Sequence, residues 1–321
     1  MSNLTVPSWC KSQQQFLSTQ VANNALAHAY LISSGKGTGK LALAHWLVSV
    51  FACNKRQIDA EDILQACQQC KPCLLKKAST YPDEKLIDQA GATVSVDAIR
   101  ETSNFLQKTS QIGSGQTVII NHAEDMTIAA ANALLKTLEE PTANTLLILL
   151  AENSEHLLPT IISRCQIVSL KTLSGSELSK HFNDTRISNL ANMTFLPELQ
   201  SSELYQHYIE MAQAFTNFLV TPSQRALFLQ ALNGHERSIV WLERVVTTLM
   251  RDKEQLIKEG ALTHNDLVTL TKVLNSDSLP RIFQLILAFN QKSKTLVQAN
   301  DTMLKEKLVI EIAQLMDKLE A

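Results

Sequence analysis

A glycine-rich turn stands between an apolar run and a helical pattern near the start of the chain. Residues 33–41 read SSGKGTGKL and follow the apolar run Ala29–Ser33, which predicts a buried strand. Glycines let backbone N–H groups turn inward on a phosphate, and a lysine at the start of the next helix reaches the terminal phosphates. A strand, such a turn and a helix in this order are the setting of a phosphate-binding loop. Its candidate residues are Gly35, Gly37, Gly39 and Lys40.

Two parts of this predicted site depart from the pattern of a hydrolysing enzyme. Ser34 stands where the first glycine belongs, and Leu41 stands where a Ser or Thr hydroxyl binds Mg²⁺. A later apolar run ends in Asn121 and His122, where an ATPase of this kind carries Asp and Glu to hold Mg²⁺ and orient water. We therefore expect a degenerate ATP site without hydrolysis. A turn that binds no ligand is the structural alternative, and His122 is interpreted as a loop histidine without chemistry.

The first half of the chain alternates apolar runs with helical patterns, which predicts an α/β fold with a parallel sheet covered on both faces. The expected strands are Ala29–Ser33, Lys85–Ile87, Thr117–Asn121, Thr145–Ala151 and Gln166–Leu170. Beyond this point we expect helices only. Their buried faces are predicted at Leu204, Tyr208, Met211, Phe215 and Leu219, and at Leu304, Leu308, Ile312, Leu315 and Leu319. A length of 321 residues suits two or three domains.

The composition is that of an ordinary globular protein, with 45% hydrophobic and 19% charged residues. The net charge of −2 gives no global basic surplus, so any contact with nucleic acid must be local or shared with partners. Residues 1–16 have no basic start followed by an apolar run, and the longest apolar runs are far too short to cross a bilayer. We therefore expect a cytoplasmic protein without membrane contact.

Four of the six cysteines are clustered, at Cys53, Cys67, Cys70 and Cys73. In a reducing compartment such a cluster favours a metal over disulfides, and two-residue gaps let neighbouring sulfurs turn toward one ion. We predict one structural Zn²⁺, since four thiolates leave no open position for catalysis. Buried free cysteines or an eroded metal site are the alternatives. The remaining Cys10 and Cys165 are expected to be free, buried thiols.

Four segments of the chain resemble the AAA+ subunits of bacterial clamp loaders. They are Leu26–Leu31, Val96–Glu101, Asn132–Pro141 and Ile162–Cys165. By residue pattern alone the third belongs to a core helix with an apolar stripe at Ile128, Ala131, Leu134, Leu135 and Leu138. The resemblance implies a RecA-like AAA+ domain with a five-stranded parallel sheet over 1–170, interrupted by a zinc module at about 53–73. A small helical lid over 171–202 and an all-α collar domain over 203–321 complete the expected organisation.

The resemblance also implies a function, because eroded ATP motifs beside an intact Ser-Arg-Cys motif are typical of the non-hydrolysing subunit of the loader. Such a subunit is a component of the DNA polymerase III holoenzyme and has no enzyme activity of its own. Its expected partners are ATPase motor subunits and a delta subunit in a hetero-pentamer, which loads a sliding clamp onto primed DNA. Arg164 would act in trans as an arginine finger on a neighbouring subunit's ATP.

Other interpretations of the same residues stay open. From sequence alone, Arg164 would by default cap carbonyl groups or pair with a local carboxylate. The chain could be an active ATPase subunit of the same loader that tolerates Leu41 and Asn121. It could also be a zinc-dependent nucleic-acid-binding module, which would bind DNA by itself with a steep salt dependence. The near-neutral net charge argues against this third interpretation.

Overall fold

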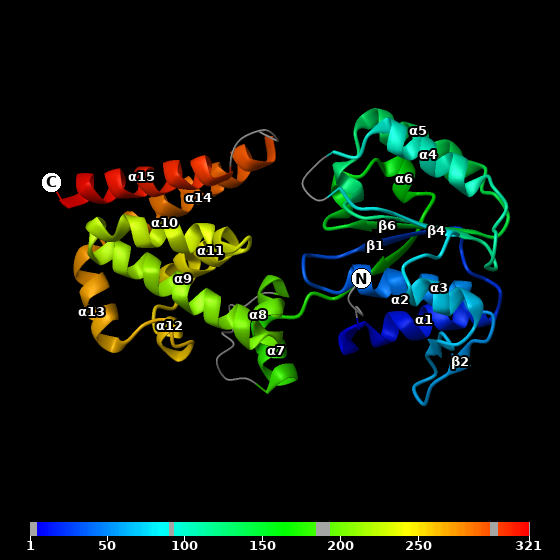
Figure 1. The fold of residues 1–321 in the computed structure, drawn as a ribbon, viewed down its shortest axis with the longest axis horizontal. Helices are drawn as coiled ribbons and strands as arrows, with labels where there is room; N and C mark the ends of the chain where they lie inside the picture. The colour runs from blue at the N-terminus through cyan, green and yellow to red at the C-terminus, as the bar shows by residue number, and fades with distance from the viewer. Residues whose placement is uncertain (1–4, 90–92, 184–192, 296–300, 321) are drawn as a thin grey trace. The chain divides into compact units, whose positions relative to one another are not determined.

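The computed structural model describes residues 5–89, 93–183, 193–295 and 301–320. The chain separates into two compact units, Met1–Thr172 and Leu173–Ala321 (Figure 1). Each unit has its own apolar core, because none of the clusters of buried apolar side chains includes residues from both. Among the helices in the described ranges, none has the length and apolar character that a membrane crossing needs.

The first unit is built on a five-stranded parallel sheet in the order β4-β5-β6-β1-β7. Its strands are β1 Ala29–Ser33, β4 Glu84–Ile87, β5 Gln116–Ile120, β6 Thr145–Ala151 and β7 Gln166–Ser169. All five predicted strands are confirmed, with ends that differ by at most one residue. A two-stranded antiparallel hairpin of β2 Gln57–Ile58 and β3 Leu64–Gln65 was not predicted, because two-residue strands leave no periodic signal.

The three inner strands β5, β6 and β1 are buried on both faces, which explains why they are mostly apolar, whereas the edge strand β7 has only Val168 buried. In β1, Leu31 packs with the cluster on one face, and Tyr30 and Ile32 pack with the cluster on the other. β1 lies between β6 and β7, and its Leu31 is opposite Leu149 of β6 and Ile167 of β7. The α/β prediction is therefore confirmed at the level of individual side chains.

Helices cover the two faces of the sheet, as Figure 1 shows. Apolar residues of α1 and α2 belong to one cluster, and those of α4, α5 and α6 belong to the other. The helices of this unit are α1 Lys11–Ala22, α2 Lys40–Ala52, α3 Lys71–Lys77, α4 Val96–Leu106, α5 Ile128–Glu139 and α6 Pro159–Ile162, with short 3-10 turns η1 Ser8–Cys10, η2 Ala123–Asp125 and η3 Ser154–His156. Hydroxyl groups mark helix starts here: Ser95 accepts a hydrogen bond from Ala98 N, and Thr127 from Ala130 N.

The predicted apolar stripe of α5 is confirmed except at its first residue. Ala131, Leu134 and Leu138 are buried, and Leu135 is partly buried. Ile128 is 75% exposed, so its assignment to the buried face was wrong. It is the first residue of the helix, where the apolar periodicity continues beyond the buried part of the stripe.

In the described part of the second unit, all regular structure is helical, as expected. Its elements are α7 Gly175–Phe182, η4 Met193–Phe195, α8 Leu196–Gln200, α9 Ser202–Val220, η5 Pro222–Gln224, α10 Arg225–Asn233, α11 Ser238–Arg251, α12 Gln255–Lys258, α13 His264–Val273, α14 Ser278–Thr295 and α15 Asp301–Glu320. The predicted face of α9 is confirmed, since four of its five residues are buried and Leu204 is partly buried. On α15, Leu308 and Ile312 are buried and Leu304 and Leu315 partly buried, while the side chain of Leu319 lies outside the described residues.

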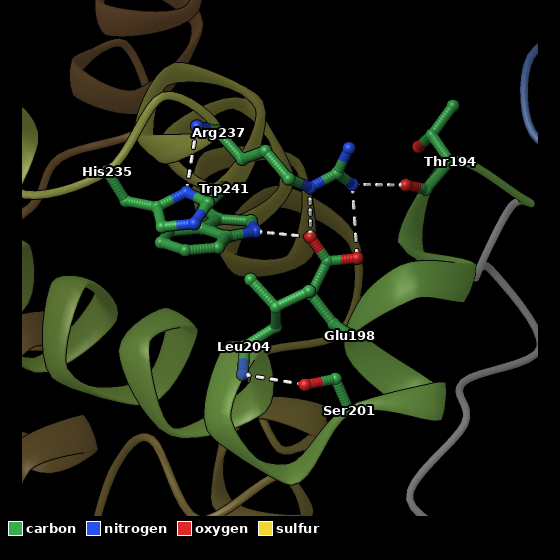
Figure 2. A network of polar contacts seen from close by, with 7 residues as sticks. All are labelled: Thr194, Glu198, Ser201, Leu204, His235, Arg237 and Trp241. Carbon is green, nitrogen blue, oxygen red and sulfur yellow. Dashed lines mark hydrogen bonds and ion pairs between the residues drawn. The ribbon is translucent and has the colours of Figure 1, made fainter. Parts of the chain in front are cut away.

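The buried carboxylate of Glu198 connects α8 to the start of α11, as Figure 2 shows. Glu198 is 1% exposed and accepts hydrogen bonds from Arg237 Nε at 2.5 Å and from Trp241 Nε1 at 2.6 Å. Arg237 Nη2 also donates to the backbone oxygen of Thr194 at 2.7 Å. The segment predicted as a lid, 171–202, includes residues 184–192, which lie outside the described ranges. Its separation from a collar at residue 202 stays a prediction.

Candidate functional site

The predicted phosphate loop connects β1 to α2, with Lys40 as the first residue of the helix. Gly37 and Gly39 have φ angles of 78° and 89°, a left-handed conformation that strains residues with a Cβ. A Cβ on Gly39 would also lie 2.7 Å from Cδ and Cγ of Pro7. The glycines are therefore required by the turn itself and by the close approach of the N-terminal segment.

Lys40 is turned inward in this structure. Its side chain is buried, and Nζ donates a hydrogen bond of 2.9 Å to the backbone oxygen of Ser34. Burial lowers the pKa of Lys40, although Glu152 and Glu124 oppose this by favouring the charged form. The amine that would reach a terminal phosphate is thus engaged by the loop that it belongs to.

The N-terminal segment packs against the same loop. Trp9 Nε1 donates to the backbone oxygen of Thr38 at 2.9 Å, and Cys10 Sγ lies 3.5 Å from the same oxygen. The Thr38 hydroxyl donates to the backbone oxygen of Gly35 at 2.9 Å. Burial raises the pKa of Cys10 to about 11, which makes it an unreactive thiol at neutral pH. These contacts fix the loop to the N-terminal segment.

Two positions depart from the pattern of an ATPase. Leu41 lies in the first turn of α2, after the loop that follows β1, and Asn121 directly follows β5. Leu41 packs against the apolar cluster that includes α1 and α2. Asn121, directly after β5, donates from Nδ2 to Asp88 Oδ1 at 3.2 Å. His122 has a φ of 54°, a conformation found mainly at turns. The side chain of Leu41 has no oxygen, and the side chain of Asn121 has no charge. This arrangement is therefore a poor fit for a magnesium-bound nucleotide.

Two carboxylates that the sequence analysis did not single out reach the same edge of the sheet. Ligand atoms of His122, Glu124 and Glu152 lie within 4.8 Å of one another. Glu124 Oε1 accepts from the backbone N–H of Glu152 at 2.8 Å, and Glu152 lies 3.6 Å from Lys36 Nζ. Glu152 directly follows the strand run Thr145–Ala151. Ligands of parallel sheets bind outside the carboxyl ends of the strands, so the position of Glu152 in the sequence could have marked it as a candidate.

The four clustered cysteines converge, with their sulfur atoms within 4.8 Å of one another. Cys53 is the C-cap of α2, Cys70 is the N-cap of α3 and Cys73 lies in the first turn of α3. Cys67 follows the β2–β3 hairpin, which brings it back to the end of α2. The structure therefore joins residues that are up to twenty positions apart in one site.

The geometry of this four-cysteine cluster fits a tetrahedral metal ion. A Zn–S distance of about 2.3 Å implies sulfur–sulfur distances of about 3.8 Å. The Cys53–Cys70 distance is 3.9 Å and the Cys70–Cys73 distance is 3.4 Å. Backbone N–H groups of Cys67 and Cys70 point at neighbouring sulfurs at 3.3 Å, as thiolates require. Backbone hydrogen bonds from Gln69 and Cys70 lower the pKa of Cys67 to about 6, whereas burial raises the pKa of Cys53 and that of Cys73. Cys67 therefore favours its metal-binding form by itself, and the other two need a bound cation to do so.

The zinc module predicted at about 53–73 is fastened to the rest of the unit by polar contacts at several places. Lys76 of α3 forms an ion pair with Glu84 of β4, and His45 of α2 contacts the same carboxylate at 3.3 Å. Trp46 Nε1 donates to the backbone oxygen of Leu64 at 3.0 Å, and Leu64 N donates to the Ser18 hydroxyl at 2.9 Å. The module thus has anchors on α1, α2 and the sheet that are independent of a metal.

Arg164 lies between α6 and β7 and is far from the phosphate loop in sequence. Its Nη2 lies 2.7 Å from Glu139 Oε1, and its Nη1 donates to the backbone oxygen of Thr160 at 3.0 Å. In the free chain Arg164 therefore pairs with a carboxylate and caps a carbonyl group, which is the alternative that the sequence alone favoured. The neighbouring Cys165 is partly buried instead of fully buried, and burial raises its pKa to about 11.

The fold and the loop define a class: an α/β protein with a phosphate-loop motif at the carboxyl end of its parallel sheet. The family model described as DNA polymerase III, delta subunit, matches residues 10–174, which is just over half of the chain. The chain belongs to this family.

Sequence comparison finds relatives named DNA polymerase III subunit delta'. The protein of Pseudomonas aeruginosa is 41% identical over 156 residues, which cover 47% of this chain and 46% of the relative. The protein of Bacillus subtilis is 34% identical over 185 residues, which cover 56% of this chain and 54% of the relative. The chain thus spans about half the length of the curated relatives that it matches.

Structural comparison finds a gamma subunit-related protein of DNA polymerase III from Thermotoga maritima, with a TM-score of 0.49 and 16% identity. That match covers 94% of this chain and 99% of the Thermotoga chain.

Proposed function

We propose that this chain is a non-hydrolysing, stator-like subunit of the replicative clamp loader. The relatives named as delta' subunits support the assignment to the DNA polymerase III holoenzyme. In this role the chain has no ATPase activity of its own. It helps an assembly of motor subunits and a delta subunit to load the sliding clamp onto primed DNA.

The observation that carries this proposal is the state of the phosphate loop. The side chain of Leu41 offers no oxygen to a metal, and Asn121, which donates to Asp88, is neutral where an ATPase carries a carboxylate. Each change removes one part of the machinery that phosphoryl transfer needs. Together they favour a subunit that acts on another subunit's nucleotide.

Arg164 is the residue through which we propose that this action occurs. A planar guanidinium matches phosphate oxygens and places fixed positive charge where charge develops in phosphoryl transfer. The side chain is 36% exposed, so a neighbouring subunit can reach it. The role in trans is inferred from the family resemblance of the Ser-Arg-Cys motif, because the contacts of the free chain are local ones.

Structural zinc and a hetero-pentameric assembly complete the proposal. Cys53, Cys67, Cys70 and Cys73 would hold one ion that fixes the hairpin β2–β3 against the end of α2. The collar over 203–321 would be the oligomerisation domain that holds the subunit in the ring, and the helical lid over 171–202 precedes it. The protein would reach the clamp and DNA as part of that ring, in the cytoplasm.

The test is Arg164→Ala in a loader reconstituted with its ATPase subunits. Subunit assembly and zinc content should stay normal while clamp- and DNA-stimulated ATP turnover and clamp loading fall. An arginine finger supplied in trans contributes about 10³ to 10⁵ in turnover at the site it completes. The whole assembly should lose less, because other motor sites have their own neighbours. Arg100→Ala, at an exposed position of α4, is the matched control.

Unchanged turnover and loading in an assembled Arg164→Ala loader would refute the proposed mechanism.

The second candidate is an active ATPase subunit of the same loader. The observation in its favour is the pair Glu124 and Glu152 beside His122, which offers carboxylates near the loop although the usual acidic pair is absent. Magnesium-dependent turnover by the pure chain, lost on Lys40→Ala, would establish this candidate. The stator proposal expects no turnover by the pure chain in the first place.

A further inference from the structure

Three oxygen acceptors surround the guanidinium of Arg164. Glu139 Oε1 lies 2.7 Å from Nη2, and Nη1 donates to the Thr160 carbonyl at 3.0 Å and to the Ser163 hydroxyl at 3.3 Å. Glu139 is the last residue of α5, whereas the other two acceptors belong to α6 and its C-cap. The side chain is therefore oriented by two helices that come from different parts of the chain.

The contact with Glu139 contributes little to folding. The two side chains are 36% and 52% exposed, and ion pairs at such positions are screened by water. A carboxylate at the C-terminal end of a helix also faces the negative end of the helix dipole, which is unfavourable for α5 itself. Stability of the free chain is thus a weak explanation for a carboxylate at this position.

Orientation of Arg164 is a stronger explanation. A free arginine side chain has many rotamers, and fixing them when a ligand arrives reduces the gain from the new contact. The hydrogen bonds to Thr160 and Ser163 both come from Nη1, and Glu139 Oε1 forms an ion pair with Nη2. A guanidinium has five N–H donors, so the Nε–H group and an N–H of Nη2 remain for a phosphate. The carboxylate can hold the group in place without occupying all of it.

We propose that Glu139 is a positioning residue, which keeps the Arg164 guanidinium oriented before it meets the phosphates of a neighbouring subunit's nucleotide. This inference rests on the proposed role of Arg164 in trans. Glu139 touches neither nucleotide nor metal in this scheme, and its effect passes through Arg164 alone.

The experiment compares Glu139→Ala with Glu140→Ala in the reconstituted loader. Glu140 is the adjacent exposed carboxylate and serves as the matched control. For Glu139→Ala we expect kcat for ATP to fall about twofold to tenfold, the cost of leaving one rotamer-rich side chain unordered. KM should change little, because Arg164 acts mainly on charge that develops during the reaction. Thermal unfolding should be unchanged, since alanine suits the end of a helix.

Two further variants separate positioning from a structural role. Glu139→Gln keeps a carbonyl acceptor at the same place and should recover part of the lost kcat. Glu139→Ala in an Arg164→Ala background should cause no additional loss, because the group that it positions is already gone.

Each outcome decides something different. If Arg164→Ala lowers turnover and Glu139→Ala does not, the positioning role is wrong and the proposed function stands. An additional loss from Glu139→Ala in the Arg164→Ala background would also overturn it, since Glu139 would then act by another route. If Arg164→Ala itself has no effect, both the proposed function and this inference fail.

Discussion

Glu84 of β4 connects the cysteine-bearing segment to the central sheet by an ion pair with Lys76. Its carboxylate is shared by Lys76, which follows the cysteines on α3, and by His45 of α2. Burial acts to raise the pKa of Glu84, but the contacts with His45 and Lys76 together outweigh it and hold the pKa below its ordinary value of 4.5. The charged form is therefore the form that the fold stabilises.

We predict that the Glu84 contribution to stability depends on pH in one direction. A carboxyl group with a lowered pKa stabilises the folded state above its unfolded pKa and loses this effect as pH falls through its folded pKa. Glu84→Gln should lose about 1 to 3 kcal/mol of unfolding free energy at pH 7, because Lys76 is left without its charged partner. The difference from the unsubstituted protein should shrink below pH 4.5.

Urea unfolding at pH 7 and at pH 3.5 measures this difference. Glu101→Gln is the control, because its carboxylate also pairs with a lysine but is 74% exposed. An equal loss for Glu84→Gln at both pH values would mean that packing, and not charge, explains the contribution.

Which contacts the sequence could predict depends on how local they are. Gly37, Gly39 and the four cysteines follow from spacing, because loop conformation and tetrahedral ligation impose fixed intervals along the chain. The partners of Lys76 and Arg164 do not follow from spacing. Glu84 and Glu139 reach them only after the strands and helices have packed, and many exposed carboxylates would have been equal candidates beforehand.

At the scale of elements, the β2–β3 hairpin and α3 form a small insertion with few apolar contacts of its own. Ile63, Leu64 and Cys73 are buried, but Ile58 is 67% exposed and Leu74 is 54% exposed. The other attachments of this insertion to the unit are mostly polar, so burial of these few apolar side chains offsets only part of the entropy of ordering its backbone. Metal binding is the most direct source of the missing stability, since structural zinc contributes folding free energy.

We predict one equivalent of zinc in protein purified without chelators. Cys70→Ser should reduce the zinc content several-fold or more, because the Cys70 sulfur lies 3.9 Å from that of Cys53 and 3.4 Å from that of Cys73 and is one of four ligands. Cys165→Ser, which changes a free cysteine outside the cluster, should keep the full content. Elemental analysis with a thiol titration measures both. A well-folded, metal-free protein with four titratable thiols in the cluster would contradict the assignment.

The periodic elements were predictable because burial repeats along them. The five strands and the faces of α9 and α15 have enough residues for a pattern, and tertiary packing agreed with that pattern. Ile128 shows the limit of this reasoning. It continues the stripe of α5 by spacing but belongs to the helix end that neighbouring elements do not cover, and periodicity carries no information on where coverage stops.

For the whole molecule, the division into two units with separate cores predicts two independent unfolding transitions. The three tryptophans allow each to be followed. Trp9 and Trp46 belong to the first unit, and Trp241 belongs to the second. Trp46 bonds to the backbone of the β2–β3 hairpin, and Trp241 bonds to the buried Glu198. The fluorescence of Trp46 therefore reports on the first unit near the hairpin, and that of Trp241 reports on the second unit near Glu198.

Glu198→Ala should destabilise the second unit by about 3 to 5 kcal/mol, since it leaves Arg237 without the buried partner of its ion pair. In a Trp9→Phe/Trp46→Phe background, the fluorescence of Trp241 should show this loss. Zinc chelation should lower the transition that Trp46 reports in a Trp9→Phe/Trp241→Phe background, and it should leave the Trp241 transition in place. Glu236→Ala, at an exposed position beside Arg237, is the control for the substitution. If chelation shifted both transitions equally, the two units would unfold as one, and separate cores would not make separate domains in this protein.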